Sequence, residues 1–186
     1  MSSREKILSA IRGIEKEEIQ LPKLPDFGVK GPLSEVFTLS ILGNKGEVIS
    51  KSDLESWLEK QQFPKIISLA KGLEQFSNLE LPKDPHELDD LNLAILEGQF
   101  GVAENGAIWL DERQLPLRAL PFIAEHLVLV LRKTDLFPTL HQAYQEIGVE
   151  YSGFGLFIAG PSKTADIEQS LVIGAHGAKS LRVVLS

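Results

Sequence analysis

The sequence predicts an α/β fold in which helices flank a mixed β-sheet. Short apolar runs alternate along the chain with segments of helical period, which is typical of a sheet covered on both faces. Asn105 and Gly106 lie between two apolar runs, and Asn-Gly in that setting indicates a β-hairpin, so part of the sheet is antiparallel. With 186 residues, of which 43% are hydrophobic, the chain is long enough to bury one substantial core.

The N-terminal part of the chain divides into an arm and a linker. Ser2 and Glu5 have the spacing of a capping box, and apolar residues follow at helical spacing, so we expect a short amphipathic helix over residues 3–16. Prolines and glycines gathered between residues 20 and 34 indicate a linker. We therefore expect a helical arm (1–19), a linker (20–34) and an α/β domain (35–186). The arm either packs on the domain or binds a partner, including a second copy.

Within the domain, the expected strands are the short apolar runs Val36–Leu42, Ile66–Ala70, Leu91–Leu96, Phe100–Ala103, Ala107–Leu110, Leu127–Leu131, Leu156–Ala159 and Leu181–Leu185. Two helices are expected between them. The first covers residues 52–62 and begins with a capping box of Ser52 and Glu55. The second runs over residues 135–147 and is capped by Thr134.

Composition narrows the classes of function. The formal net charge is −7 at pH 7 and no basic run occurs, so neither nucleic acid nor an anionic membrane surface is an expected partner. The N-terminus is charged where a signal peptide is apolar, and no apolar run approaches the ~20 residues of a membrane span, so we expect a cytoplasmic protein. The chain has no cysteine, which excludes cysteine-ligated iron–sulfur clusters on it, and its histidines are scattered. No metal or cofactor is expected.

The first candidate site is the predicted hairpin turn that contains Glu104. This carboxylate follows a strand and precedes Asn105 and Gly106. Ligands collect at strand ends in α/β folds, so Glu104 is placed to act as a nucleophile or base. The alternative is that Glu104 is a solvated turn residue and that Asn105 and Gly106 only form the hairpin.

The second candidate site is the segment 160–168, where we expect a helix to begin. Ser162 or Thr164 can cap this helix, because each side chain can accept hydrogen bonds from free backbone N–H groups. Such N–H groups also bind anions, and Lys163 adds a donor, so the expected ligand is a phosphate, carboxylate or nucleotide. Asp166 is expected to brace the turn. The alternative is that the whole segment is structural.

The third candidate is His176, which lies between two glycine turns. The backbone therefore bends beside a titratable ring. Ser162, Asp166 and His176 are the residue types of a nucleophile triad, but a triad is defined by geometry and no Gly-x-Ser-x-Gly elbow occurs. The alternative is a turn histidine held by hydrogen bonds.

These segments together resemble the LutC/YkgG family, whose domain is called the LUD domain. The run Phe100–Leu110 is similar to that family's Ile-Ala-Glu-Thr-Gly-Thr-Leu signature. The runs Gly160–Glu168 and Gly174–Gly177 resemble its C-terminal Gly-Pro-Ser-x-Thr-Ala-Asp-Ile-Glu and Gly-x-His-Gly-Pro motifs. Asn105 and Ala178 stand where the pattern has threonine and proline. The resemblance implies a Rossmann-like α/β fold of the NagB/RpiA/CoA-transferase-like group.

The resemblance also implies a function. The implied function is that of an accessory protein of lactate utilisation, in which lactate is oxidised to pyruvate. Its implied partners are iron–sulfur redox proteins. A chain without cysteine is then the component that carries no cluster. A homo-oligomer is compatible with this role. The implied site has Glu104 as its catalytic residue and binds an anionic small molecule through Gly106, Ser162, Lys163, Thr164, Asp166 and His176.

Two further functions stay open at this point. Ala103–Gly106 is similar to the Ser-Glu-Asn-Gly motif of CoA transferases, in which the glutamate carries CoA as a thioester. This similarity implies an enzyme of CoA-transferase or sugar-phosphate type with Glu104 as nucleophile. The other function is a small-molecule sensor whose segment 160–177 binds an anion. Whether Glu104 and that segment form one site is not decided by the sequence.

Overall fold

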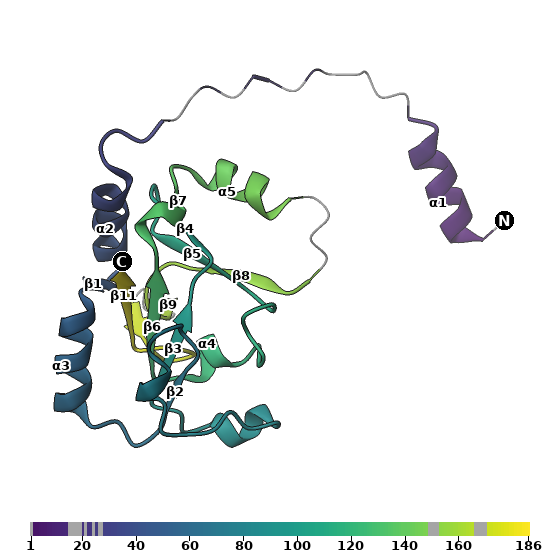
Figure 1. The fold of residues 1–186 in the computed structure, drawn as a ribbon. Helices are drawn as coiled ribbons and strands as arrows, with labels where there is room; N and C mark the ends of the chain where they lie inside the picture. Colours follow the sequence, from purple (N-terminus) through teal and green to yellow (C-terminus); the bar gives the residue numbers. More distant parts are fainter. Residues whose placement is uncertain are drawn as a thin grey trace.

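The centre of the protein is a parallel β-sheet. The computed structural model describes residues 2–14, 20, 22–23, 25, 28–148, 153–165 and 171–186. The central sheet has five strands in the order β1-β11-β6-β3-β2, and each described strand pair in it is parallel (Figure 1). These strands are β1 (Glu47–Ile49), β2 (Ile66–Ser68), β3 (Leu93–Glu97), β6 (His126–Leu131) and β11 (Ser180–Leu185). The predicted α/β fold is confirmed.

A second sheet contains the predicted hairpin. It has four strands in the order β7-β4-β5-β8, which are β4 (Phe100–Val102), β5 (Ala107–Asp111), β7 (Leu136–Phe137) and β8 (Gly155–Ile158). β4 and β5 pair antiparallel through the Asn105-Gly106 turn, whereas β4 and β7 pair parallel. The mixture of strand directions that the hairpin predicts therefore lies in this second sheet.

Helices cover both sheets. The helices of the domain are α2 (Leu33–Gly43), α3 (Lys51–Gln61), α4 (Leu120–Ile123) and α5 (Leu140–Ile147), with short 3₁₀ helices at η1 (Glu74–Phe76), η2 (Pro85–Leu88) and η3 (Lys133–Asp135). α3 packs on one face of the central sheet, while α2 and α4 share the other face with the second sheet. α5 packs on the outer face of the second sheet (Figure 1). Among the described residues, no helix is long and apolar enough to cross a membrane.

The central strands are apolar on both faces because each face meets a core. In β6, Leu127 and Leu129 lie in the core shared with the second sheet, whereas Val128 lies in the core beneath α3. In β3, Ala94 lies in the core shared with the second sheet, and Ile95 lies in the core beneath α3. Side chains of a strand alternate between faces, so a strand buried on both sides has a nearly continuous apolar sequence.

The N-terminal arm forms a helix, α1 (Ser3–Arg12), that stands apart from the domain (Figure 1). The predicted capping box is present, since the Ser2 hydroxyl accepts from the Glu5 N–H and the Glu5 carboxylate accepts from the Ser2 N–H. The helix ends at Arg12 rather than at residue 16, with Gly13 as its cap. None of its residues is buried.

The prediction of a strand over Val36–Leu42 is wrong, because this run lies within α2. Its β-branched and aromatic residues favour a strand, but the side chains that pack inward have helical spacing. Phe37 and Ile41 are fully buried, whereas Leu39 and Leu42 are exposed. The burial pattern thus follows a period of 3.6 residues and not of two.

Both predicted helix starts in the domain are displaced. α3 begins one residue earlier than predicted, and its capping box is formed by Ser50 and Asp53 rather than by Ser52 and Glu55. The predicted helix over 135–147 is interrupted, since Leu136 and Phe137 pair with β4 as β7. The proline at position 138 favours an extended residue before it, so α5 begins only at Leu140, capped by Thr139.

The predicted helix start is also wrong over residues 160–165, which the structure describes. Lys163–Ala165 form β9, which pairs antiparallel with β10 (Leu171–Ile173) in a two-stranded sheet of its own. The anion-binding argument from a helix N-terminus therefore does not apply. Asp166, which was expected to brace the turn, lies outside the described residues.

Candidate ligand-binding site

The segment that follows β8 lines a cavity of about 270 Å³. The cavity lies at the amino ends of β6 and β11, where Leu127 and Ala178 contribute to its wall. Its polar side chains are Ser162 and His176. The full wall is formed by Pro121, Phe122, Leu127, Phe157, Ile158, Ala159, Gly160, Pro161, Ser162, His176, Gly177 and Ala178.

Backbone hydrogen bonds bring the two halves of the segment together at Ser162. The N–H of Ser162 donates to the carbonyl oxygen of Ala178 at 2.9 Å, and the carbonyl oxygen of Ser162 accepts from the N–H of Gly174 at 2.9 Å. Gly177 fits closely against Ser162, because a Cβ atom at Gly177 would lie 3.1 Å from the Ser162 Cβ. The start of the segment, at Ser162, and its end, at Gly177 and Ala178, therefore meet at one cavity.

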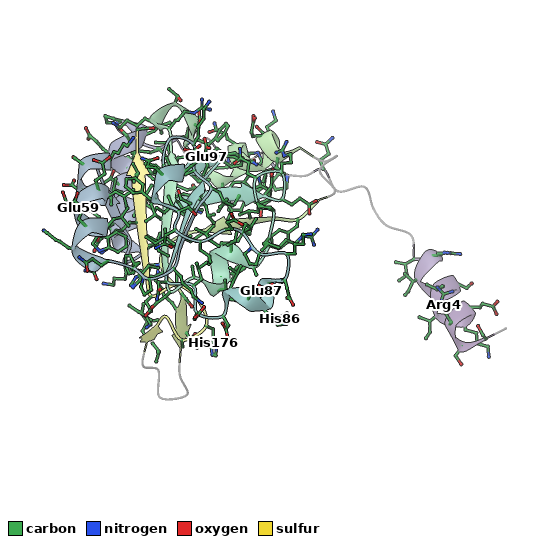
Figure 2. The ribbon with its side chains drawn as sticks, turned by 60° about the horizontal axis from the view of Figure 1, so that its bottom comes forward. Arg4, Glu59, His86, Glu87, Glu97 and His176 are labelled. Carbon is green, nitrogen blue, oxygen red and sulfur yellow. The ribbon has the colours of Figure 1, made fainter. Side chains whose placement is uncertain are left out.

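Ser162 and His176 are both available to a ligand. Ser162 is half-buried and His176 is exposed at the base of the β9–β10 hairpin (Figure 2). In the described part of the chain, neither the Ser162 hydroxyl nor the His176 ring has a hydrogen-bond partner in the protein. A hydroxyl and an imidazole can each donate and accept a hydrogen bond. Since the described lining residues include no acid, the cavity suits a small ligand with carboxylate and hydroxyl oxygens.

Lys163 and Thr164 lie outside this cavity. They belong to β9, in which Lys163 is exposed and pairs with Ile173, and Thr164 is half-buried and pairs with Val172. On β10, Leu171, Val172 and Ile173 expose 56%, 42% and 43% of their surface, so the hairpin presents an apolar strand beside the cavity. The structure thus brings together Ser162 and His176 from the predicted set, without Lys163 or Thr164.

Glu104 has a different environment. Its carboxylate oxygen Oε1 accepts a hydrogen bond from the Leu140 N–H at 2.5 Å, at the first residue of α5. Its own N–H donates to the carbonyl oxygen of Pro138 at 3.2 Å. A carboxylate at a helix N-terminus satisfies a free N–H group and interacts favourably with the helix dipole. Glu104 is not among the residues that line the Ser162–His176 cavity.

Gly106 completes the hairpin turn against α2. Its φ is +69°, a conformation that favours glycine, and a Cβ atom there would lie 3.0 Å from the Ile41 nitrogen. The neighbouring turn residues are also tied to α2. The Ser40 hydroxyl donates to the Ala103 carbonyl oxygen at 2.7 Å, and Asn44 Nδ2 donates to the Asn105 carbonyl oxygen at 2.7 Å. Gly106 thus has a structural position that brings the hairpin close to the helix.

Sequence reasoning missed two residues that shape the site. Phe122, which is 50% exposed, contributes to the cavity wall from α4. Asn44 caps the C-terminus of α2 and contacts the hairpin turn. The signal for Asn44 is its place directly after Gly43, since Gly and Asn are frequent at helix ends. No local pattern points to Phe122, because the wall is assembled from distant segments.

Known proteins resemble this chain in sequence. The family model of the LUD domain matches residues 3–186. The "Lactate utilization protein C" of Bacillus pumilus is 34% identical over 90 residues, which cover 45% of this chain and 38% of that protein. The "Uncharacterized protein YkgG" of Escherichia coli K12 is 29% identical over 114 residues, which cover 58% and 46%. The chain spans less than half the length of these two relatives.

A solved structure has a similar fold. The crystal structure of a DUF162 family protein from Deinococcus radiodurans matches with a TM-score of 0.60 at 18% sequence identity. The match covers 82% of this chain and 95% of the other. This likeness supports the α/β architecture.

Proposed function

The chain belongs to the LUD domain family, and on that premise we propose that it serves lactate utilisation by binding a small hydroxy- or oxo-acid at the Ser162–His176 cavity. Relatives named lactate utilization protein C support the process. The chain has no cysteine to hold an iron–sulfur cluster, so partner proteins with such clusters carry the electrons in this proposal.

One observation carries the proposal. Gly160–Ser162 and His176–Gly177, which belong to the C-terminal motifs of the family resemblance, line a cavity in which the Ser162 hydroxyl and the His176 imidazole have no protein partners among the described residues. Lactate has a carboxylate and a hydroxyl that can hydrogen-bond to these two groups, and a methyl group that suits the apolar wall formed by Phe122, Leu127 and Phe157. The site therefore favours an acid over an apolar molecule of the same size, because only the acid can hydrogen-bond to Ser162 and His176.

Growth on lactate tests the role in the cell. We expect a strain without this chain to grow poorly on L-lactate as the sole carbon source and normally on glucose. The wild-type chain should restore growth, and Ser162→Ala with His176→Ala should not. Lys163→Ala is the matched control, because Lys163 is exposed next to Ser162 but lies outside the cavity. Immunoblots establish equal protein levels.

The outcomes separate two parts of the proposal. Normal growth of the deletion strain on lactate would remove the role in lactate utilisation. If the deletion strain grows poorly on lactate and the double variant restores full growth, the chain has a role in lactate utilisation but the cavity is not needed for it.

A further inference from the structure

The helix α1 carries an apolar face that nothing in the described chain covers. Ile7 and Ile11 lie about one helical turn apart and expose 60% and 53% of their surface, and Ile14, which follows the Gly13 cap, exposes 62%. The helix itself has no buried residue, and Figure 2 shows it with Arg4 away from the domain. An amphipathic helix of ten residues is marginal on its own in water, so α1 gains most of its stability from whatever it packs on.

The domain carries a groove of matching character beside α2 and the edge strand β1. Its volume is about 640 Å³, and its apolar wall includes Leu39, Val48, Ile49 and Leu185. On α2, Leu39 and Leu42 expose 69% and 51% of their surface. This groove is separate from the Ser162–His176 cavity, because the described residues that line the two are all different.

The two surfaces are alike in their exposed apolar ridges. On α2 the exposed apolar residues Leu39 and Leu42 lie three positions apart, and on α1 Ile7 and Ile11 lie four positions apart, so each helix presents a short apolar ridge that can pack against the other. Arg4 and Arg12 lie at the two ends of α1, and the groove is lined by one acid, Glu35, and one cation, Lys133. The chain as a whole is acidic, with a formal net charge of −7. A helix with more cations than anions, such as α1, is therefore attracted to a second copy of the chain.

We propose that α1 of one chain occupies the groove of a second copy, so that two chains exchange their arms about a two-fold axis. The structure holds α1 away from its own domain (Figure 1), and the sequence between them contains Pro22, Pro25 and Pro32. The helix and the groove are on the same chain. A reciprocal exchange therefore covers both apolar surfaces of both copies and closes the assembly.

The mass of the full chain in solution is the first test. Sedimentation or light scattering should give twice the chain mass of 20.5 kDa. Ile7→Asp with Ile11→Asp should give a monomer, and so should Leu39→Asp in the groove. These side chains are exposed, so the substitutions leave the domain core intact. Ser9→Asp is the control, because residues two apart on a helix face different directions and Ser9 points away from Ile7 and Ile11. A monomeric wild-type chain overturns the proposal.

Cysteine cross-linking identifies the contact, since the chain has no cysteine of its own. Mixing the Ile11→Cys chain with the Leu39→Cys chain under mild oxidation should give a disulfide-linked dimer that contains one of each. Two results overturn the proposal. One is a monomer with an internal disulfide when both cysteines are on one chain, because α1 then occupies its own groove. The other is a dimer that forms without this cross-link, because its interface is then a different face.

Discussion

Asn44 and Asn105 are joined by a hydrogen bond of 2.7 Å, in which the side-chain amide of Asn44 donates to the carbonyl oxygen of Asn105. The backbone of Asn44 has a second neighbour, because a Cβ atom at Gly160 would lie 2.5 Å from the Asn44 carbonyl oxygen. The two motifs of the family resemblance are therefore anchored at the same end of α2. Their side chains nevertheless differ in environment, since Glu104 contacts α5 and Ser162 lines the cavity.

Gly160→Ala should destabilise the protein strongly. Gly160 has a φ of +97°, and its new Cβ would overlap the Asn44 carbonyl oxygen. Backbone strain of about 1–2 kcal/mol and overpacking of about 1–3 kcal/mol add to a loss of roughly 2–5 kcal/mol. The control is Gly72→Ala, where φ is +77° and nothing lies within 4 Å of the new Cβ, so strain alone remains. Urea unfolding measures both, and equal losses would mean that the contact with Asn44 is unimportant.

Glu104→Ala should lower stability by about 1 kcal/mol, because the first N–H of α5 loses its acceptor. Glu104→Gln keeps an acceptor oxygen and should lose less. The difference between the two variants in thermal unfolding therefore measures the hydrogen bond to Leu140. If both variants are as stable as the wild type, this hydrogen bond does not support α5.

The role of Glu104 as a nucleophile stays a prediction of the CoA-transferase similarity, and mass spectrometry tests it. Incubation with acetyl-CoA should leave the mass of the chain unchanged, because the carboxylate is held by Leu140 and Glu104 is not among the residues that line the ligand cavity. A thioester trapped on Glu104 and absent from Glu104→Gln would contradict this expectation and establish the enzymatic reading.

Stability should fall as the pH falls below about 6.5, the ordinary pKa of histidine, because of His126. Burial lowers the pKa of His126, and the Arg182 and Lys179 cations lower it further against the opposing effect of Glu125. The Ser180 hydroxyl accepts from Arg182 at 3.0 Å and forms a hydrogen bond with His126 Nδ1 at 2.8 Å, and it donates in that bond when the neutral imidazole carries its proton on Nε2. Below this pH the unfolded chain takes up the proton before the folded one does, so the free energy of unfolding decreases.

Urea unfolding at pH 5 and pH 7.5 measures this effect. His126→Gln should reduce the stability difference between the two pH values. His86→Gln is the control, because the His86 side chain is 93% exposed. If the His126→Gln variant shows the same stability difference between pH 5 and pH 7.5 as the wild type, the pH dependence comes from other groups.

The sequence predicted most strands of the fold because apolar runs are local signals. β3, β5 and β6 lie within a few residues of their predicted bounds, since their side chains are buried on both faces. α2 was mistaken for a strand because its residue types favour a strand and only tertiary packing shows the helical period. β7 was hidden in a predicted helix because a strand of two residues has no period of its own.

The site was predictable only in part. The turns around Ser162 and His176 could be identified as a candidate site because glycine, proline and polar residues are concentrated there. That Gly174 and Ala178 pair with Ser162 depends on hydrogen bonds between segments twelve or more residues apart, and no local pattern gives that register. The hydrogen bond of Glu104 to α5 joins residues 36 positions apart and was equally inaccessible.

Ligand binding at the Ser162–His176 cavity tests the central claim most directly. Thermal unfolding would be recorded with L-lactate, pyruvate and CoA, for the wild type and for Ser162→Ala. A ligand at 100 times its Kd adds about 2.7 kcal/mol, which for a chain of this size raises the Tm by roughly 5–11 °C. We predict such a rise with L-lactate or pyruvate in the wild type and its loss in Ser162→Ala. No rise with either acid up to millimolar concentrations, or the same rise in the variant, would contradict the claim.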